Sequence, residues 1–153
     1  MKKKSKIIFF CLHAGEVKIM LGKRVFGADE HFWWLPGGSV EGDETLLQAA
    51  IREVFEEFIP GEIIGKILFN LLQHNVGLPT VDYRADNSQV TIHFIQLPKE
   101  ELPEIKDEFV EIRWFALHQL PEKISRQYNH IKEYFNKEYF ETLSRNFKLE
   151  NYF

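Results

Sequence analysis

The chain has 153 residues, of which 44% are hydrophobic and 14% aromatic, which is ample for a buried core. Its 19 lysine and arginine residues stand against 23 aspartate and glutamate residues. The resulting net charge of −4 argues against electrostatically driven binding to long nucleic acids. Cys11 is the only cysteine, which excludes an intramolecular disulfide framework and a cysteine-type zinc site, so we expect a reducing compartment. We expect a single domain over residues 1–153.

The N-terminal residues combine lysines with an apolar run, as the start of a secretory signal can. The run is short, ends at His13 and has no evident cleavage site, so we expect Ile7 to His13 to be a strand. Val17 to Lys23 predicts a second strand, and Ala14-Gly15-Glu16 a hairpin turn between the two. No stretch approaches the roughly 20 apolar residues of a membrane helix, so we expect a soluble, cytoplasmic protein without a membrane partner.

Three consecutive aromatic residues follow the second strand. Phe32 to Leu35 predicts a short strand that enters a turn at Gly37-Gly38. On a strand, neighbouring side chains point to opposite faces, so at least one of Phe32, Trp33 and Trp34 is expected to point away from the core. Trp34 or Trp33 could stack on a nucleobase, and the alternative is that all three pack in the core.

An acidic helix is predicted after this turn. The apolar residues Leu47, Ala50 or Ile51, Val54 and Phe58 have helical spacing, so Thr45 to Phe58 should form a helix with one buried side. Asp43 and Glu44 are well placed for the positive N-terminal end of this helix.

Three glutamates share one face of this helix. Glu53, Glu56 and Glu57 stand at i, i+3 and i+4, with about 5–6 Å between Cβ atoms, where like charges repel. A divalent cation is the natural counter-charge, whereas a solvated helix face is the simpler alternative. The fixed spacing of Gly38 and Arg52 to these acids favours the cation.

The same segment resembles the signature of the Nudix hydrolases, G-x5-E-x7-R-E-U-x-E-E-x-G-U, in which U is aliphatic. Trp34-Leu35-Pro36-Gly37-Gly38 also resembles the strand and turn that enter this signature in the family. The matching positions are Gly38, Glu44, Arg52, Glu53, Val54, Glu56 and Glu57.

The end of the segment departs from the signature, because Ile59 and Pro60 stand where the pattern has glycine and an aliphatic residue. Pro60 cannot continue a helix, so the helix should stop by about Phe58. We expect Gly61 to supply the left-handed turn, displaced by two residues.

The resemblance implies a MutT-type Nudix domain, an α/β/α sandwich with a mixed β-sheet. It implies that Glu56 and Glu57 bind Mg²⁺, for which Mn²⁺ can substitute, and that Glu53 is a further ligand or the general base. The backbone carbonyl of Gly38 is a ligand in relatives. Such acids suit Mg²⁺, which prefers oxygen ligands and usually keeps waters and substrate phosphates in its shell.

The resemblance also implies roles for residues around the acids. Arg52 is expected to orient the carboxylates of the segment, including Glu44, by bidentate hydrogen bonds. Arg24, at the end of the second strand beside Lys23, is a candidate phosphate ligand, since the family often uses a basic residue there. The alternative is a solvated charge. Trp34 is the candidate for stacking on the substrate.

The second half of the chain predicts further strands and then helices. Ile63 to Gln73, Thr91 to Leu97 and Val110 to Leu117 are predicted as strands, and His74 to Gln89 as a polar loop. After Pro121, apolar residues at helical spacing predict one long or two short C-terminal helices over about residues 122–149. Their aromatic stripe could cover the sheet or form a homodimer face.

One more acid is a candidate ligand. Glu108 precedes the last predicted strand, where MutT-type relatives carry a loop glutamate that serves as a distal metal ligand or base. Asp107, Glu104 and Glu111 compete for this role, and the alternative is a surface charge.

The resemblance implies Mg²⁺-dependent hydrolysis of a small molecule, a nucleoside diphosphate linked to another moiety, such as a (d)NTP, with water attacking at phosphorus. A nucleotide-sugar or ADP-ribose hydrolase of the same family is the alternative. Sugar-nucleotide enzymes that cleave at carbon lack part of the final glutamate pattern, which is present here. The altered exit at Ile59 and Pro60 suggests a third possibility, a non-catalytic nucleotide-binding module.

Overall fold

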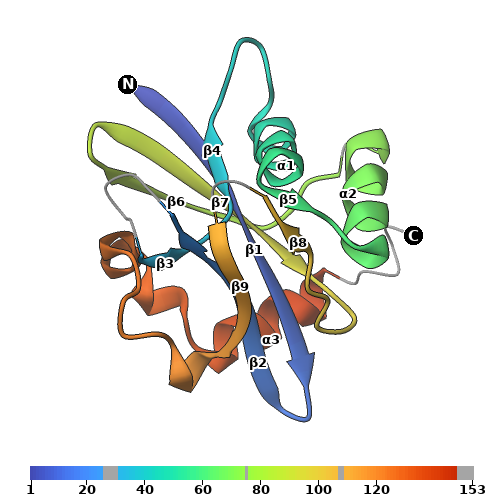
Figure 1. Cartoon of the computed structure of the whole chain (residues 1–153). Helices are drawn as coiled ribbons and strands as arrows, with labels where there is room; N and C mark the ends of the chain where they lie inside the picture. The colour runs from blue at the N-terminus through green and yellow to red at the C-terminus, as the bar shows by residue number, and fades with distance from the viewer. Residues whose placement is uncertain (26–30, 75, 107–108, 148–153) are drawn as a thin grey trace.

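A mixed β-sheet forms the centre of the computed structural model, which describes residues 1–25, 31–74, 76–106 and 109–147. In these residues the sheet has seven strands, with β3-β2-β1-β7-β6 as its main order, and β1 and β7 are parallel neighbours at its middle (Figure 1). β4 pairs with the N-terminal half of β1, β9 pairs with β2, and β5 and β8 form a separate small ladder. The strands are β1 (Lys2–His13), β2 (Glu16–Arg24), β3 (Trp33–Trp34), β4 (Gly37–Ser39), β5 (Phe58–Ile59), β6 (Thr80–Ala85), β7 (Ser88–Gln96), β8 (Glu104–Ile105) and β9 (Phe109–Ala116).

Helices cover both faces of this sheet. On one face, α1 (Leu46–Glu57) and α2 (Glu62–His74) pack in a cluster that includes Ile7 and Phe9 of β1. On the other face, α3 (Lys137–Asn146) and the segment before it pack in a second cluster that includes Ile8 and Phe10. Because residues of β1 alternate between the two clusters, the sheet is buried on both sides, and the predicted α/β/α sandwich with a mixed sheet is confirmed.

The N-terminal hairpin forms as predicted. β1 and β2 are antiparallel and are joined at Ala14 and Gly15, which have φ values of 52° and 77°. Two successive positive φ values match the right-handed twist of the flanking strands, and Gly15 adopts this conformation without a Cβ penalty. β1 extends further toward the N-terminus than expected, because Lys2 to Lys6 pair with β7.

The segment predicted as a strand at Ile63 to Gln73 is a helix, α2, so that prediction was wrong. Its buried residues Ile64, Ile67, Leu68 and Leu71 have the i, i+3, i+4, i+7 spacing of a helix face. The isoleucines favoured a strand by propensity, but packing of this face against the sheet decides the structure.

The predicted polar loop from His74 to Gln89 contains a strand, β6, which was missed. Val81 and Tyr83 are buried while Asp82 and Arg84 are exposed, the period-two pattern of a half-buried strand. β6 turns into β7 at Asp86 and Asn87, which have φ values of 49° and 62°. The run of polar residues therefore contains a hairpin at the edge of the sheet.

The C-terminal segment is helical in short pieces. Two 3₁₀ helices, η2 (Arg126–His130) and η3 (Lys132–Tyr134), precede α3, so neither one long nor two short helices describes the segment fully. A further 3₁₀ helix, η1 (Leu117–Gln119), follows β9. Phe135 and Phe140 pack on the sheet, so this aromatic stripe covers it.

Across the described ranges, no helix is both long enough and apolar enough to span a membrane.

Candidate active site

The acidic helix α1 begins and ends where its sequence predicts. Thr45 is the N-cap, and its hydroxyl accepts a hydrogen bond from the backbone N–H of Gln48, whose side chain accepts from the N–H of Thr45. This reciprocal capping satisfies two backbone donors that a helix start leaves open. α1 ends at Glu57, and Phe58 is already extended, two residues before Pro60.

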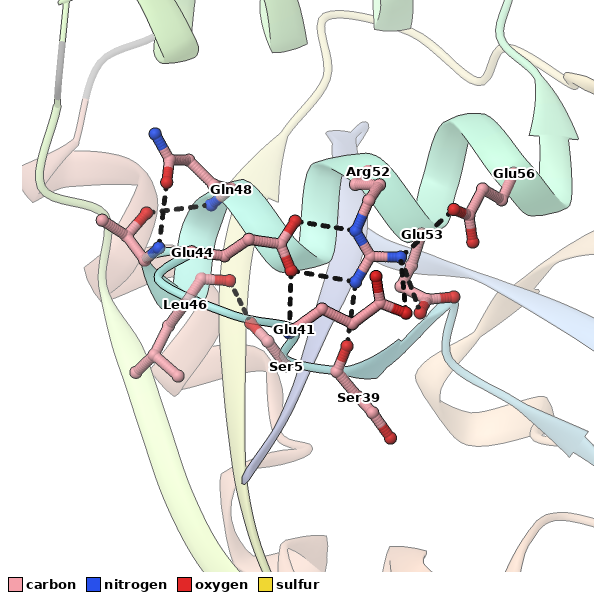
Figure 2. Close-up of polar contacts among 10 residues, drawn as sticks. Ser5, Ser39, Glu41, Glu44, Leu46, Gln48, Arg52, Glu53 and Glu56 are labelled. Atoms are coloured by element: carbon pink, nitrogen blue, oxygen red, sulfur yellow. Dashed lines mark hydrogen bonds and ion pairs between the residues drawn. The ribbon is translucent and has the colours of Figure 1, made fainter. Parts of the chain in front are cut away.

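Arg52 is the centre of a network of acidic side chains at this site (Figure 2). Its Nε and Nη2 donate to the two carboxylate oxygens of Glu44 at 2.7 and 3.0 Å. Nη2 also donates to the carbonyl of Ser39 at 2.9 Å, which connects α1 to β4. Nη1 donates to Glu53 and to Glu56, at 3.2 Å in both cases. The expectation that Arg52 orients the carboxylates of the segment matches this geometry.

The network shifts the titration of its members. Hydrogen bonds from Arg52, and from the backbone N–H of Glu41, hold the pKa of Glu44 below its usual value. The same bond to Glu44 is the main reason that the pKa of Arg52 is raised. Both groups are therefore ionised at neutral pH, and the bidentate geometry fixes the guanidinium plane against α1.

Glu57 is the buried acid of the site, with 1% of its surface exposed. Its Oε1 accepts a hydrogen bond from the backbone N–H of Gly37 at 2.8 Å, and its Oε2 lies 3.9 Å from Nη2 of Arg24. Gly37 has a φ of 139°, and a Cβ there would lie 2.3 Å from the carbonyl oxygen of Ser5. Only glycine fits this close to β1, which explains the first glycine of the Gly37-Gly38 turn.

Glu53 lies against the neighbouring glycine. A Cβ on Gly38 would lie 2.4 Å from the carboxylate carbon of Glu53, so the side chain occupies the space that glycine leaves open. Glu53 and Glu57 therefore meet consecutive residues of β4. The Glu56 side chain is 58% exposed and extends from the same helix toward solvent.

The predicted substrate ligands differ in their placement. Arg24 lies at the acids: besides facing Glu57, it reaches toward the carbonyl of Leu35 at 3.5 Å and lies over the ring of Phe109 at 5.1 Å. Trp34 is 1% exposed and packs inside the core, so its ring presents no face to a nucleobase. The stacking prediction for Trp34 is therefore corrected to the alternative of core packing.

The loop acid Glu108 and its neighbour Asp107 lie outside the described residues. Of the other two candidates, Glu104 is exposed in β8, and Glu111 forms an ion pair with Arg113.

The exit from α1 differs from expectation at Gly61, which does not adopt the left-handed conformation. Instead, a Cβ on Gly61 would lie 2.5 Å from the carboxylate carbon of Glu101. That carboxylate accepts hydrogen bonds from the N–H groups of Ile63 at 2.9 Å and Ile64 at 2.8 Å, the first turn of α2. Gly61 makes room for a distant capping residue.

A family model described as the NUDIX domain matches residues 3–135. The chain belongs to this family. It is a Nudix phosphohydrolase, an enzyme class that acts on phosphoanhydride bonds, in agreement with the interpretation of its sequence. No curated protein matches the chain significantly.

Solved Nudix structures share the fold. A Caenorhabditis elegans Ap4A hydrolase in a binary complex is 18% identical, with a TM-score of 0.61, and the match covers 96% of this chain and 100% of that one. The Nudix hydrolase RenU from Mycobacterium smegmatis is 15% identical, with a TM-score of 0.63 and coverages of 94% and 86%. The NUDIX domain of Shewanella oneidensis NrtR, complexed with ADP ribose, is 18% identical, with a TM-score of 0.60 and coverages of 95% and 88%. At these identities the likeness concerns the fold.

The donor chemistry of the Nudix helix fits a divalent metal. Glu53, Glu56 and Glu57 supply only hard oxygen atoms, and Glu53 and Glu57 meet the backbone of β4 at Gly38 and Gly37. In the described part of the chain, no three acidic, histidine or cysteine side chains already converge as a metal cluster. Arg52 contacts Glu53 and Glu56 and would have to share these carboxylates with a cation.

A polar contact that the sequence did not reveal supports the start of the Nudix helix. Ser5 of β1 donates to the carbonyl of Leu46 at 2.5 Å, and its hydroxyl lies 3.0 Å from Nε2 of His93 on β7. The pairing of β1 with β7 brings Ser5 and His93 together, and they are 88 residues apart in the chain. The period-two position of Ser5 between lysines was the only local signal.

Proposed function

We propose that this Nudix hydrolase catalyses Mg²⁺-dependent hydrolysis of a nucleoside diphosphate linked to another moiety, such as a (d)NTP, by attack of water at phosphorus. The observation that supports it best is Glu57. A carboxylate that is 1% exposed is costly to ionise without compensating charge. Here it faces a backbone N–H and Arg24, on a helix that carries two further carboxylates.

The proposed roles follow the contacts of each side chain. Glu56 and Glu57, with the carbonyl of Gly38, would hold the metal, which supplies charge neutralisation of the phosphate oxygens and a lowered pKa for a bound water. Arg52 acts as a positioning residue, because it holds Glu44, Glu53 and Glu56 in one network.

Arg24 and Glu53 act on the substrate side of this network. Arg24 would donate to a phosphate oxygen, since its guanidinium lies beside Glu57 and 19% of its side-chain surface is exposed. Glu53 would complete the ligand set or accept the proton of the attacking water. If Glu53 is the base, Glu53→Gln should remove the acidic limb of the pH profile of kcat. If Glu53 is instead a metal ligand, the same variant should need a higher metal concentration for half-maximal activity.

The substrate alternatives correspond to two of the solved relatives. The C. elegans protein is an Ap4A hydrolase, and the S. oneidensis domain was solved with ADP ribose. Ap4A and ADP ribose both contain a nucleoside diphosphate, so the proposed function covers either. The complete set of Glu53, Glu56 and Glu57 favours attack at phosphorus over attack at a sugar carbon.

The test is release of phosphate, pyrophosphate or nucleotide from (d)NTPs, diadenosine tetraphosphate, ADP-ribose and nucleotide sugars, with Mg²⁺, Mn²⁺ or EDTA. Metal-dependent cleavage of a nucleoside diphosphate derivative would support the proposal and define the substrate class. A folded protein that cleaves none of them with either metal would overturn it in favour of a nucleotide-binding module. Cleavage in H₂¹⁸O separates the sites of attack, because ¹⁸O enters the phosphate only if water attacks phosphorus.

A further inference from the structure

The pairing of β2 with β9 is irregular at Arg24. Lys23 pairs with Glu111, and the next residue, Arg24, pairs with Phe109. Val110 is therefore an extra residue on β9, and such a bulge turns the flanking side chains relative to a regular ladder. Phe109 is 2% exposed and belongs to the cluster under the Nudix helix, whereas Val110 is 47% exposed. The bulge thus places the ring of Phe109 beside Arg24, on the face of the sheet that the Nudix helix covers.

The ring of Phe109 is held from two sides of the site. A Cβ on Gly22 would lie 2.6 Å from two carbons of the ring, so the missing side chain lets the ring pack directly on β2. The ring also stacks on Phe58, the C-cap residue of the Nudix helix, with 5.1 Å between centroids and 28° between the planes. Contacts with β2 and with the end of α1 therefore fix the position of this ring.

The guanidinium of Arg24 lies over this fixed ring. Its Cζ is 5.1 Å from the centroid of Phe109, a distance at which the aromatic face attracts a cation. The same guanidinium lies 3.9 Å from the buried carboxylate of Glu57. A long arginine side chain loses conformational freedom when it binds a ligand, and a contact that already orders it reduces this loss. The ring thus prepares Arg24 beside Glu57.

We propose that Phe109 is a positioning residue, which holds Arg24 in the orientation that binds a phosphate group of the substrate. Phe109 acts through the guanidinium, since its own ring is buried. The proposal rests on the proposed function, in which Arg24 donates to a phosphate oxygen. It gives a role to the bulge at Val110 and to the close approach at Gly22, because both serve to bring the ring to Arg24.

The first experiment measures binding without catalysis. The wild type, Phe109→Met and Phe109→Tyr are titrated calorimetrically in Mg²⁺ with methylenediphosphonate, a diphosphate analogue that water does not cleave. Methionine fills most of the volume of the ring but has no aromatic face, so the dissociation constant should rise about threefold to tenfold. Tyrosine keeps the aromatic face and should bind within about twofold of the wild type. Phe9→Met is the matched control, because Phe9 is buried in the same cluster, and it should change the dissociation constant less than about twofold.

A double-mutant cycle tests whether Phe109 acts through Arg24. Without the guanidinium, in the Arg24→Gln background, Phe109→Met should weaken binding by less than about twofold further. Gly22→Ala displaces the ring and removes neither side chain, so it should weaken binding with the same dependence on Arg24, and it keeps the test valid if Phe109→Met does not fold. A loss that is equally large in the Arg24→Gln background, or no larger than that of Phe9→Met, would overturn the proposal.

Steady-state kinetics on a cleaved substrate distinguish positioning from simple loss of stability. Phe109→Met should raise KM by about the same factor as the dissociation constant of methylenediphosphonate and change kcat less than about twofold. A variant that is only less stable would contain less active enzyme, so its apparent kcat would fall while KM stayed the same. That second pattern would contradict a positioning role.

The titration also separates this proposal from the proposed function. If no substrate is cleaved but the effect of Phe109→Met on binding depends on Arg24, the hydrolase assignment fails while the positioning role is supported. If substrates are cleaved and Phe109→Met changes neither affinity nor KM, only the positioning role is overturned. If Arg24→Gln itself leaves the affinity unchanged, the phosphate role of Arg24 fails together with that of Phe109.

Discussion

Arg52 and Glu57 show how single residues make an acidic helix compatible with a folded protein. Arg52 donates to three glutamates of the Nudix segment, and for Glu53 and Glu56 this offsets the repulsion that their spacing on one helix creates. Glu57 is separated from this network and is buried against Gly37 and Arg24. The two residues thus divide the acids into a group that is held by a guanidinium and one carboxylate that is held by the backbone.

The first prediction concerns Glu57. Glu57→Gln keeps an oxygen that can accept from Gly37 but removes the buried charge, so turnover should fall on the order of 100-fold or more. The melting temperature in EDTA should stay the same or rise, because no charge is then buried. Steady-state kinetics and a thermal melt measure both, and Glu133→Gln, an exposed change, serves as the control. Strongly reduced stability with retained activity would contradict the metal assignment.

At the scale of elements, a buried polar contact connects two strands to the Nudix helix. Ser5 donates its one hydroxyl hydrogen to Leu46, so it accepts from His93 Nε2–H, which fixes the neutral tautomer of that ring. Burial lowers the pKa of His93 to about 4, an effect that the charge of Asp82 partly opposes. The start of α1 therefore depends on a histidine that must remain neutral.

A pH dependence of stability follows from this histidine. Between about pH 6.5 and about pH 4 the unfolded chain binds a proton at His93 and the folded chain does not, so the free energy of unfolding falls as the pH drops through this window. Urea unfolding at several pH values should show a flatter profile for His93→Gln than for the wild type. His118→Gln, a change at an exposed histidine, should leave the wild-type slope, and equal slopes in all three proteins would refute the assignment.

A second prediction at this scale concerns the cap of α2. Glu101 accepts from Ile63 and Ile64 and is supplied by the segment before β8, 37 or more residues away. Glu101→Ala leaves two N–H groups of the first turn without this acceptor and should lower the free energy of unfolding by about 1 kcal/mol. Urea unfolding measures this, with the exposed Glu104→Ala as the control. An effect no larger than that of the control would show that solvent replaces the cap.

At the scale of the whole molecule, the sheet separates two faces that are both covered by helices. α1 and α2 cover one face with the acids at its edge, and η2, η3 and α3 cover the other (Figure 1). The strand pair β1 and β4 connects them, since Ser5 pairs with Gly38 and Lys6 with Gly37. The possible homodimer stays a prediction, and the aromatic residues named for it are at least partly used in covering the sheet.

Metal binding should be visible in the stability of the whole molecule. A cation that binds only the folded state stabilises it by about 2.7 kcal/mol at a concentration 100 times its dissociation constant. Mg²⁺ should therefore raise the melting temperature of the wild type relative to EDTA, and Glu57→Gln should reduce this rise. The same increase in both proteins would place the stabilising ion elsewhere.

The sequence by itself determined the parts of this protein that depend on local spacing. The hairpin at Gly15 and the Nudix helix from Thr45 to its end near Phe58 follow from residues close together in the chain. The family resemblance implied the bidentate pairing of Arg52 with Glu44. The tertiary structure decided what depends on packing. α2 is a helix although its isoleucines favour a strand. Trp34 is buried, whereas the strand pattern left open which of Phe32, Trp33 and Trp34 points away from the core. The partners in contacts between distant segments, such as Ser5 with His93 and Glu101 with α2, cannot be predicted from local spacing, because the pairing of strands and the close approach at Gly61 create these contacts.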